Sequence, residues 1–332
     1  MQIRKLSQEE HGDTRVLYEE VFTEDSPPFV DYYYTEKTKD NQIYVVEEDE
    51  GIQAMLHLNP YVLKVNGSEK QIDYIVAVAT RKTFRGRGYM GALMKQALCE
   101  MYEEGKTFTF LMPVAEELYL PYDFRTVYEQ ERRIYKEMSE QEGYVKEAEE
   151  ADCAGLAQAA EDYLSANYQV YAKRDEAYYQ RLLKEYAADS GKVMIFQDGD
   201  SITDCRFCYD TMGEADKNPK IMIRIIDVRR MLMSLSLTTF TAACFTVTDP
   251  LIEDNNRCIV ITGTEFSGVM LMDGVEKNSE GTITIAALSS FLFGAKTIEE
   301  IKEEEGVELS ERLCSELKKI IPLSRIYLNE VV

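Results

Sequence analysis

The chain has 332 residues, of which 45% are hydrophobic and 29% are charged, a composition typical of a globular protein with about two domains. No apolar stretch approaches the roughly 18 residues of a membrane-spanning helix, and the first residues lack the apolar core of a signal peptide. We therefore expect a cytoplasmic protein that does not associate with membranes. The net charge of −23 opposes binding to nucleic acid and to anionic lipid, and it favours a small cationic partner.

The cysteines predict neither a disulfide framework nor a metal site. Their number is odd, they are scattered, and no secretion signal precedes them, which favours reduced thiols. Cys205 and Cys208 form a CxxC pair, but the sequence has no second such pair. The two histidines of the chain, His11 and His57, lie far from this pair in the sequence. We therefore expect no bound metal.

Residues 1–140 alternate helix and strand signals and form the first predicted domain. A helix is expected after Ser7, where apolar residues beginning with Val16 recur at helical spacing, and an acidic loop and an aromatic run follow it. The later elements are expected to be strands at 43–47, 53–58, 61–65 and 73–80, a helix at 90–104 and a strand at 107–112. This alternation predicts an α/β (α+β) fold.

Two further segments follow, at 141–220 and 221–332. The first is predicted to hold helices near 147–164 and 175–186, a hairpin of strands 192–197 and 202–209, and a polar linker at 213–220. The second is predicted to hold strands at 221–227, 243–248 and 258–264, a hairpin of 268–272 with 282–285, and helices at 228–235, 286–293, 298–304 and 310–321.

The strongest functional signal is a basic, glycine-rich turn between a predicted strand and a predicted helix. Arg85-Gly86-Arg87-Gly88 forms its centre. Consecutive backbone N–H groups in such a turn bind a diphosphate together with the positive end of the following helix, and glycines permit the close approach. The turn is neither a Walker loop nor a Rossmann dinucleotide fingerprint. On spacing alone, a plain strand–helix turn with solvated arginines stays open as an alternative.

This turn resembles the acyl-CoA pyrophosphate loop, R/Q-x-x-G-x-G/A, of the GNAT acetyltransferases. Met90 stands where that pattern has Gly or Ala. Further along, Ala115–Phe124 (AEELYLPYDF) resembles the GNAT segment A-x-x-x-Y-x-x-x-G-F, with Asp123 in place of its glycine. A predicted helix and a predicted strand separate the two segments, as the GNAT fold requires.

The resemblance narrows to the enhanced intracellular survival (Eis) family. VATRKTFRGRGYMGALM and LYLPYDF are similar to its first GNAT domain, and residues 223–228 and 281–300 resemble its C-terminal sterol-carrier-like domain. The resemblance implies a GNAT domain at 1–140, a truncated GNAT-like segment at 141–220 and a sterol-carrier-like domain at 221–332. The family's complete middle domain would not fit between the other two. The resemblance also implies a homo-oligomer, either a trimer or a hexamer.

The same resemblance implies roles for particular residues, with acetyl-CoA as the cosubstrate. The residues expected to bind it are Val78, Ala79, Thr80, Arg85, Gly86, Arg87, Gly88, Tyr89, Met90 and Gly91. Tyr119 matches the tyrosine that protonates the leaving thiolate as general acid. In the family the C-terminal carboxylate enters the active site, so the carboxylate of Val332 is the implied base.

The acceptor pocket is expected at the acidic and aromatic loop near the N-terminus. Glu24, Asp25 and Phe29 are the predicted substrate-binding residues, because carboxylates and aromatic rings suit a cationic amine. We therefore expect an N-acetyltransferase that transfers acetyl directly, in a ternary complex, to an aminoglycoside-, polyamine- or lysine-like amine. The alternative is a non-catalytic protein that binds CoA or a lipid on the same scaffold.

Overall fold

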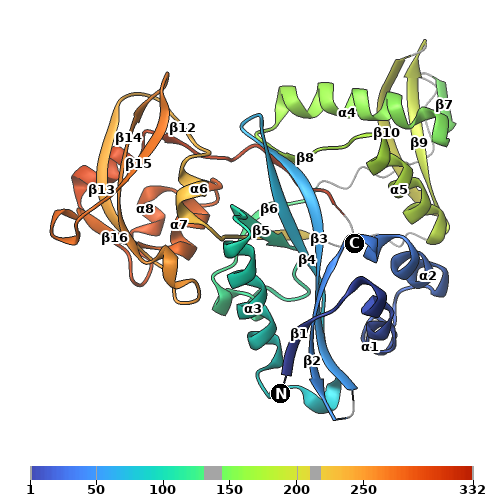
Figure 1. The fold of residues 1–332 in the computed structure, drawn as a ribbon. Helices are drawn as coiled ribbons and strands as arrows, with labels where there is room; N and C mark the ends of the chain where they lie inside the picture. Colours follow the sequence, from blue (N-terminus) through green and yellow to red (C-terminus); the bar gives the residue numbers. More distant parts are fainter. Residues whose placement is uncertain (1, 50, 131–143, 200, 210–217, 331–332) are drawn as a thin grey trace.

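The computed structural model shows a central sheet from which two smaller units extend (Figure 1). It describes residues 2–49, 51–130, 144–199, 201–209 and 218–330. The strands of the central sheet run in the order β1-β2-β3-β4-β5-β11-β6, and β8 pairs with β3 and with β19. Their bounds are β1 Gln2–Lys5, β2 Gln42–Glu48, β3 Gly51–Val65, β4 Ser68–Thr80, β5 Phe108–Leu111, β6 Arg125–Glu129, β8 Val170–Ala172, β11 Lys220–Ile225 and β19 Ile326–Tyr327.

Helices cover both faces of this sheet. On one face lie α1 (Arg15–Val21) and α2 (Pro27–Thr35), which pack on Ile43 and Val45; on the other lies α3 (Tyr89–Glu103), which packs on Tyr44 and Val46. This alternation follows from the two-residue period of a strand. The aromatic run forms α2. Val16 does not join the core as we expected, because α1 turns this side chain to solvent with 68% of its surface exposed.

The β2–β3 hairpin and the helix after the basic turn are confirmed. The two strands that we expected at 53–58 and 61–65 are one continuous strand, β3, which pairs with β4 over its whole second half. Pro60 does not interrupt β3, although proline lacks a donor N–H, because β2 pairs with β3 only up to Leu58 and β8 only from Leu63, so that β4 is the one neighbouring strand at Pro60.

The middle segment forms a small unit of its own beside the central sheet. Its sheet has the order β10-β9-β7 and carries two helices. The bounds are β7 Tyr144–Glu147, α4 Cys153–Asn167, α5 Glu176–Ala188, β9 Gly191–Asp198 and β10 Ser201–Tyr209. Both predicted helices and the predicted hairpin are present. Helix α5 faces the central sheet and contacts α2, so this unit closes over the α1/α2 side of the first domain.

The C-terminal unit is a sheet packed on helices, with the strand order β15-β14-β13-β16-β17. Its elements are α6 Val228–Leu232, β12 Ser236–Leu237, β13 Thr241–Thr248, β14 Arg257–Thr264, β15 Gly268–Asp273, β16 Gly281–Thr284, α7 Ile285–Leu292, α8 Ile298–Ile301, β17 Glu308–Leu309, α9 Glu311–Leu317 and β18 Ile320–Ile321. The predicted hairpin of 268–272 with 282–285 is wrong. β15 pairs with β14 and β16 pairs parallel with β13, because β14 and β15 are the strands joined by a tight turn.

One strand lies where the sequence did not place it. We expected the strand near 221–227 to open the C-terminal domain, but β11 pairs antiparallel with both β5 and β6 in the first domain's sheet. Its side chains Ile221, Ile223 and Ile225 are fully buried. The chain thus returns from the middle segment to complete the first sheet before it enters the C-terminal unit.

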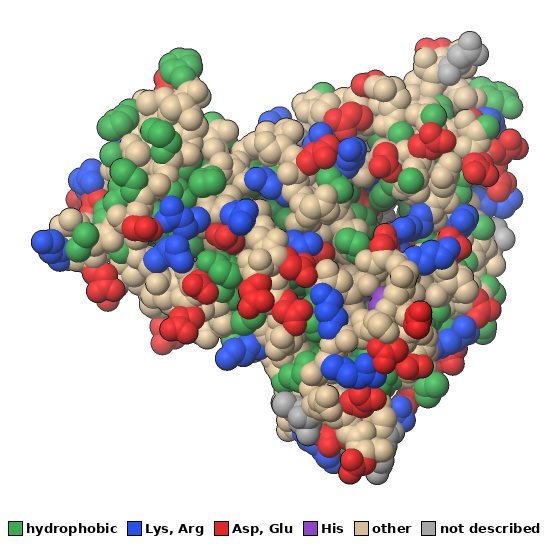
Figure 2. Space-filling model, viewed as in Figure 1, with side chains coloured by type: hydrophobic (Ala, Val, Ile, Leu, Met, Phe, Trp, Pro, Cys, Tyr) green, Lys and Arg blue, Asp and Glu red, His purple; other side chains and the backbone are tan. Residues whose placement is uncertain are grey.

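Exposed apolar side chains gather on the C-terminal unit. Phe240, Phe266, Met270 and Met272 each have more than half of their surface exposed. Figure 2 shows hydrophobic side chains grouped over this part of the molecule, whereas charged side chains of both signs cover most of the rest of that face. Grouped apolar side chains on a surface can mark a site of interaction with another molecule.

Candidate functional site

The turn between β4 and α3 presents backbone N–H groups at the start of a helix. Gly86 and Gly88 have φ angles of +77° and +82°, in the left-handed region that favours glycine. Gly88 is the N-cap of α3, and no described side chain caps the helix there. The first N–H groups of an uncapped helix and its positive end attract anions, so this turn has the geometry of a phosphate-binding site.

Two exposed arginines stand beside these N–H groups. The Nε atom of Arg85 donates to the backbone oxygen of Thr80 over 3.1 Å, and the guanidinium of Arg87 lies over the Phe84 ring at 4.4 Å. Both side chains are solvent-exposed. The structure thus brings Arg85, Gly86, Arg87 and Gly88 together on one surface, and the two cations could pair with a diphosphate.

The next three predicted residues contribute differently. The Tyr89 side chain is buried and donates to Glu48 over 2.7 Å, and Met90 packs against the core beneath α3. The Tyr89 ring also lies 6.3 Å from that of Phe84 in the basic turn, so this side chain supports the turn while the backbone N–H groups remain the candidate phosphate ligands. Gly91 gives room to another residue, since a Cβ atom there would lie 3.0 Å from the Tyr122 hydroxyl.

Next to this turn, β4 and β5 part from one another. They pair in parallel at Tyr74–Phe110 and Ile75–Leu111, where β5 ends, while β4 continues to Thr80. Ala77 has a φ of +48°, and the register against β3 shifts at this point. Such a bulge re-aims the backbone of the bulged strand. The predicted residues Val78, Ala79 and Thr80 therefore lie on β4 beyond its pairing with β5, where their backbone groups can meet a ligand.

Tyr119 lies in the short turns that follow β5. It stands between the 3-10 turns Glu116–Leu118 and Leu120–Tyr122, with 6% of its surface exposed and its ring edge-on to Phe124. Burial raises the pKa of this phenol. Its hydroxyl makes no hydrogen bond to any residue that the structure describes. A phenol that stays protonated and keeps its hydrogen bond free can donate a proton to a ligand.

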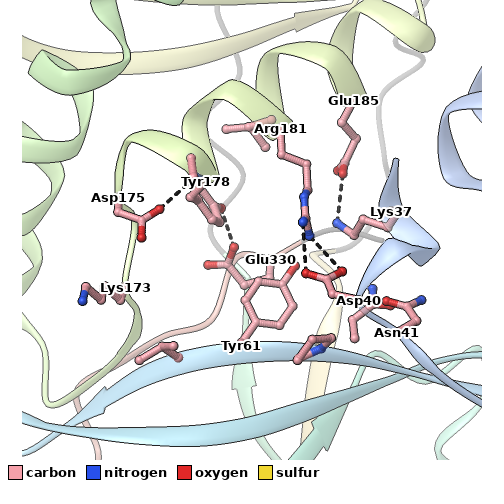
Figure 3. Close-up of a pocket in the computed structure, with 15 residues that line it drawn as sticks. Lys37, Asp40, Asn41, Tyr61, Lys173, Asp175, Tyr178, Arg181, Glu185 and Glu330 are labelled. Atoms are coloured by element: carbon pink, nitrogen blue, oxygen red, sulfur yellow. Dashed lines mark hydrogen bonds and ion pairs between the residues drawn. The ribbon is translucent and has the colours of Figure 1, made fainter. Parts of the chain in front are cut away.

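A cavity of about 260 Å³ lies on the α1/α2 side of the sheet, between β3, α5 and the C-terminal end of the chain (Figure 3). It is on the face opposite α3, because Asn59 and Tyr61 alternate with the side chains that pack on that helix. The residues that line it are Lys37, Asp40, Asn41, Asn59, Pro60, Tyr61, Val62, Lys173, Asp175, Ala177, Tyr178, Arg181, Leu182, Glu185 and Glu330.

Aromatic rings connect this cavity to the place where β4 and β5 part. Tyr61, in the cavity wall, has its ring centroid 6.2 Å from that of Tyr74 and 6.3 Å from that of Phe110. Tyr74 and Phe110 form the first of the two parallel pairs between β4 and β5. The cavity and the opening beyond these pairs therefore lie close together, with the basic turn on the far side of the sheet.

Two ion pairs, one buried and one partly exposed, join two parts of the cavity wall. Lys37 contacts Glu185 at 2.9 Å, with both side chains more than nine-tenths buried, and Tyr32 donates to the same carboxylate over 3.0 Å. Arg181 contacts Asp40 at 3.0 Å. These pairs join the first domain to α5 of the middle unit (Figure 3), so the wall is fixed by charges that are already partnered.

The end of the chain is anchored at the same cavity. Glu330 is 1% exposed, contacts Arg174 at 2.8 Å and accepts a hydrogen bond from Tyr178. Gln130 donates to the backbone oxygens of Leu328 and Glu330 over 3.0 and 3.1 Å. The predicted base, the carboxylate of Val332, lies outside the described residues.

The predicted acceptor residues lie elsewhere in the first domain. Asp25 accepts a hydrogen bond from Tyr18 over 2.7 Å, and burial raises the pKa of this carboxyl. Phe29 packs against the rings of α2, and Glu24 is exposed. None of Glu24, Asp25 and Phe29 is among the residues that line the cavity between β3 and α5.

The cavity residues themselves escaped the sequence analysis, because they come from four separate parts of the chain. One local signal was present. His57, Asn59 and Tyr61 place polar groups on one face of a strand whose other face is apolar, and buried polar groups in such a pattern indicate a site. Among the described residues, no three His, Cys, Asp or Glu side chains are grouped as metal ligands, and no helix is long and apolar enough to cross a membrane.

Two protein-family models match this chain, one in the first domain and one in the C-terminal unit. Residues 2–127 match the family model described as acetyltransferase (GNAT) domain, and residues 230–329 match the one described as sterol carrier protein domain. No curated protein sequence matches the chain. The two matches confirm the expected fold class and the resemblance to a GNAT domain and a sterol-carrier-like domain.

Solved structures match over nearly the whole chain. A probable N-acyltransferase from Enterococcus faecalis V583 has a TM-score of 0.76 at 14% identity, covering 98% of this chain and 99% of its own. A GCN5-related N-acetyltransferase from Anabaena variabilis has the same TM-score, identity and coverage. Eis1 from Mycobacterium abscessus has a TM-score of 0.69 at 14% identity, covering 99% of both chains. Residues 2–127 therefore carry a GNAT acetyltransferase domain and residues 230–329 a sterol carrier protein domain, and the fold of the whole chain is similar to that of Eis1.

Proposed function

We propose that this chain transfers an acetyl group from acetyl-CoA directly to the amine of a small cationic molecule. The observation that carries the proposal is the opening between β4 and β5, with the N-terminus of α3 beside it and the cavity next to it on the opposite face. This arrangement would let a thioester reach from the basic turn, through the sheet, to an amine on the far side. Direct transfer in a ternary complex then requires both substrates to be bound at once.

The proposed binding mode uses the sequence motif as its anchor. The diphosphate of acetyl-CoA would lie on the N–H groups of residues 86–91, with Arg85 and Arg87 neutralising its charge. The thioester would follow β4 to residues 78–80, whose backbone N–H groups beyond the bulge at Ala77 would donate to the carbonyl oxygen as it becomes an oxyanion.

The chemical step needs one acid and one base. The amine nitrogen attacks the thioester carbonyl carbon, a C–N bond forms, and the C–S bond breaks. Tyr119 would give its proton to the leaving thiolate, a role that fits its free hydroxyl and raised pKa. We propose the carboxylate of Val332 as the acceptor of the amine proton. Its support is the anchoring of Glu330, two residues earlier, in the wall of the cavity.

Charge supports a cationic acceptor. The chain carries a net charge of −23, and the cavity wall contains four carboxylates, of Asp40, Asp175, Glu185 and Glu330, against the three cations of Lys37, Lys173 and Arg181. Glu24 and Asp25 add acidic groups on the same side of the first domain. A field of this sign would attract a cation and would weaken as salt rises.

We further propose that the chain acts as a homo-oligomer, a trimer or hexamer, in the cytoplasm. The exposed apolar side chains of the C-terminal unit support self-association, because water contact with them is unfavourable. Sedimentation velocity over a range of protein concentrations tests this proposal, and a monomer at every concentration would contradict it.

Acetyl-CoA consumption with a panel of polyamines, aminoglycosides and lysyl peptides tests the activity. We expect release of free CoA that depends on the amine and falls as salt rises. A protein that binds acetyl-CoA but releases no CoA with any amine would instead be a non-catalytic binding protein, the alternative stated above.

A further inference from the structure

Two side chains in the cavity wall, Asn41 and Asn59, carry buried amides without a hydrogen-bond partner among the described residues, and Asn59 is the one that lies on the central sheet. Asn59 on β3 is 2% exposed, and neither the nitrogen nor the oxygen of its amide has a hydrogen-bond partner among the described residues. A buried amide that makes none of its hydrogen bonds destabilises the folded chain. Because Asn59 also lines the cavity, a ligand is the natural source of the missing partners.

The charged side chains around Asn59 already have ion-pair or hydrogen-bond partners. Lys37 is paired with Glu185, Arg181 with Asp40, and Glu330 with Arg174. The remaining two charged groups of the wall are also engaged, Lys173 with Glu69 and Asp175 with the backbone N–H of Tyr178. A charged ligand group at Lys37, Arg181 or Glu330 would compete with an existing ion pair, whereas a neutral polar group meets a vacant donor and a vacant acceptor at Asn59.

We infer that the cavity binds a neutral amide group of the acceptor, paired with Asn59. An amide offers one N–H and one C=O side by side, as the asparagine side chain does, so the two groups can exchange two hydrogen bonds. This inference rests on the proposed function, since it describes the part of the acceptor that does not react. It narrows the acceptor to an amine that also carries an amide, as a lysine residue within a peptide does.

The position of Asn59 fits such a ligand. Asn59 is the direct cross-strand partner of Tyr74, one strand spacing of about 4.8 Å away, and Tyr74 is paired with Phe110 just before β4 and β5 part. The Tyr74 hydroxyl is likewise buried and without a partner in the described chain. An amide held at Asn59 would thus leave a flexible alkyl amine within reach of the opening where the thioester is proposed to lie.

Binding of two matched amines tests the inference without requiring turnover. 6-Aminohexanamide and methyl 6-aminohexanoate have the same charge and nearly the same length, but the ester cannot donate a hydrogen bond. We expect calorimetry to show about tenfold tighter binding of the amide to the wild type, and loss of this preference in Asn59→Leu. Gln53→Leu is the matched control, because Gln53 is a buried amide on the same strand that does not line the cavity; it should keep the preference.

Thermal unfolding separates a binding role from a structural one. Asn59→Leu replaces an unpaired polar group with an apolar one of similar shape, so its Tm should equal or exceed that of the wild type. Equal binding of amide and ester to the wild type, or a preference that survives in Asn59→Leu, would overturn the inference. Amide-selective binding without acetyl transfer to any amine would overturn the proposed function alone. Transfer without amide selectivity would overturn the inference alone.

Discussion

The rings of Tyr74 and Phe110 are stacked, with centroids 4.5 Å apart and planes inclined by 4°. They belong to neighbouring parallel strands, and one further residue pair follows them before the strands part. Stacked aromatic rings add to the stability of a strand pair, so this contact holds β4 and β5 together directly below the opening. The opening is therefore a fixed feature of a well-packed sheet.

Tyr119→Phe should lower kcat while leaving the KM for acetyl-CoA nearly unchanged. The substitution removes one proton donor and keeps the ring that packs edge-on to Phe124. General acid catalysis contributes roughly 10²- to 10⁴-fold, and we expect a loss of that order in steady-state kinetics. Because burial raises the pKa of Tyr119, loss of its proton should lower the wild-type rate only in strong alkali. A loss below about threefold would assign Tyr119 to packing alone.

Arg85→Gln should weaken acetyl-CoA binding by roughly 3- to 10-fold in calorimetry, because it removes one cation beside the proposed diphosphate site. The affinity of the variant should also depend less on salt. Arg312→Gln is the control, since Arg312 is an exposed arginine paired with Glu280 in the C-terminal unit. Equal effects of the two substitutions would show that the basic turn is not where the diphosphate binds.

Protonation of His57 in the unfolded chain should lower the free energy of unfolding in mild acid. Burial lowers the pKa of His57 to about 3, whereas an unfolded histidine titrates near 6.5. Between these values only the unfolded chain binds the proton, so the free energy of unfolding falls as pH decreases from about 6.5 towards 3. The slope from one such group is about 1.4 kcal/mol per pH unit.

His57→Gln isolates this contribution from that of other groups. Urea denaturation at several pH values should give the variant a shallower dependence of unfolding free energy on pH than the wild type. Glutamine can still bond to the hydroxyl of Tyr33, which lies 2.9 Å from His57 Nδ1. Parallel pH profiles for the two proteins would mean that His57 is protonated in the folded chain.

Arg224→Met should destabilise the fold severely. Arg224 contacts Asp249 at 2.7 Å, and neither side chain has any exposed surface. Losing one partner of a fully buried pair leaves an uncompensated charge, which costs about 3–5 kcal/mol. Arg229→Met is the control, because Arg229 pairs with the largely exposed Asp273 and such pairs contribute at most about 1 kcal/mol. Similar urea midpoints for both variants would contradict this expectation.

Residues appended after Val332 should abolish turnover and spare acetyl-CoA binding. An extension would move the proposed base, while the basic turn lies on the other side of the sheet. Binding is measured by calorimetry and turnover by CoA release, with an N-terminal extension of the same length as the control. Normal turnover by the C-terminally extended protein would remove Val332 from the mechanism, and Glu24 or Asp25 would become the better candidate.

The sequence predicted local structure more readily than tertiary pairing. The helix after the basic turn and the hairpin of β9 and β10 follow from residue spacing and turn residues, and both are confirmed. The insertion of β11 between β5 and β6 could not be predicted, because a buried strand has the same apolar pattern in either sheet. The same limit explains the wrong pairing of residues 268–272 with 282–285.

The candidate site likewise has one part that could be predicted from local sequence and one part that depends on tertiary structure. Residues 85–91 form a contiguous motif, so their shared surface could be predicted from the sequence. Lys37, Arg181 and Glu330 meet in one cavity only because α5 and the chain's end fold over β3. Charged residues are rarely buried, and the sequence alone does not show which of them have partners.

The late return of β11 has a consequence for how the protein is made. The acetyltransferase family match ends at residue 127, yet a chain cut there would lack the strand between β5 and β6. Without it β6 has no neighbour, and the apolar edge of β5 would be open to other chains. During synthesis, β11 cannot pair with β5 and β6 until the whole middle segment has been made. The smallest portion that contains the continuous strand order from β1 to β6 is therefore one that extends through Ile225, and β19 adds to β8 only at the end of the chain.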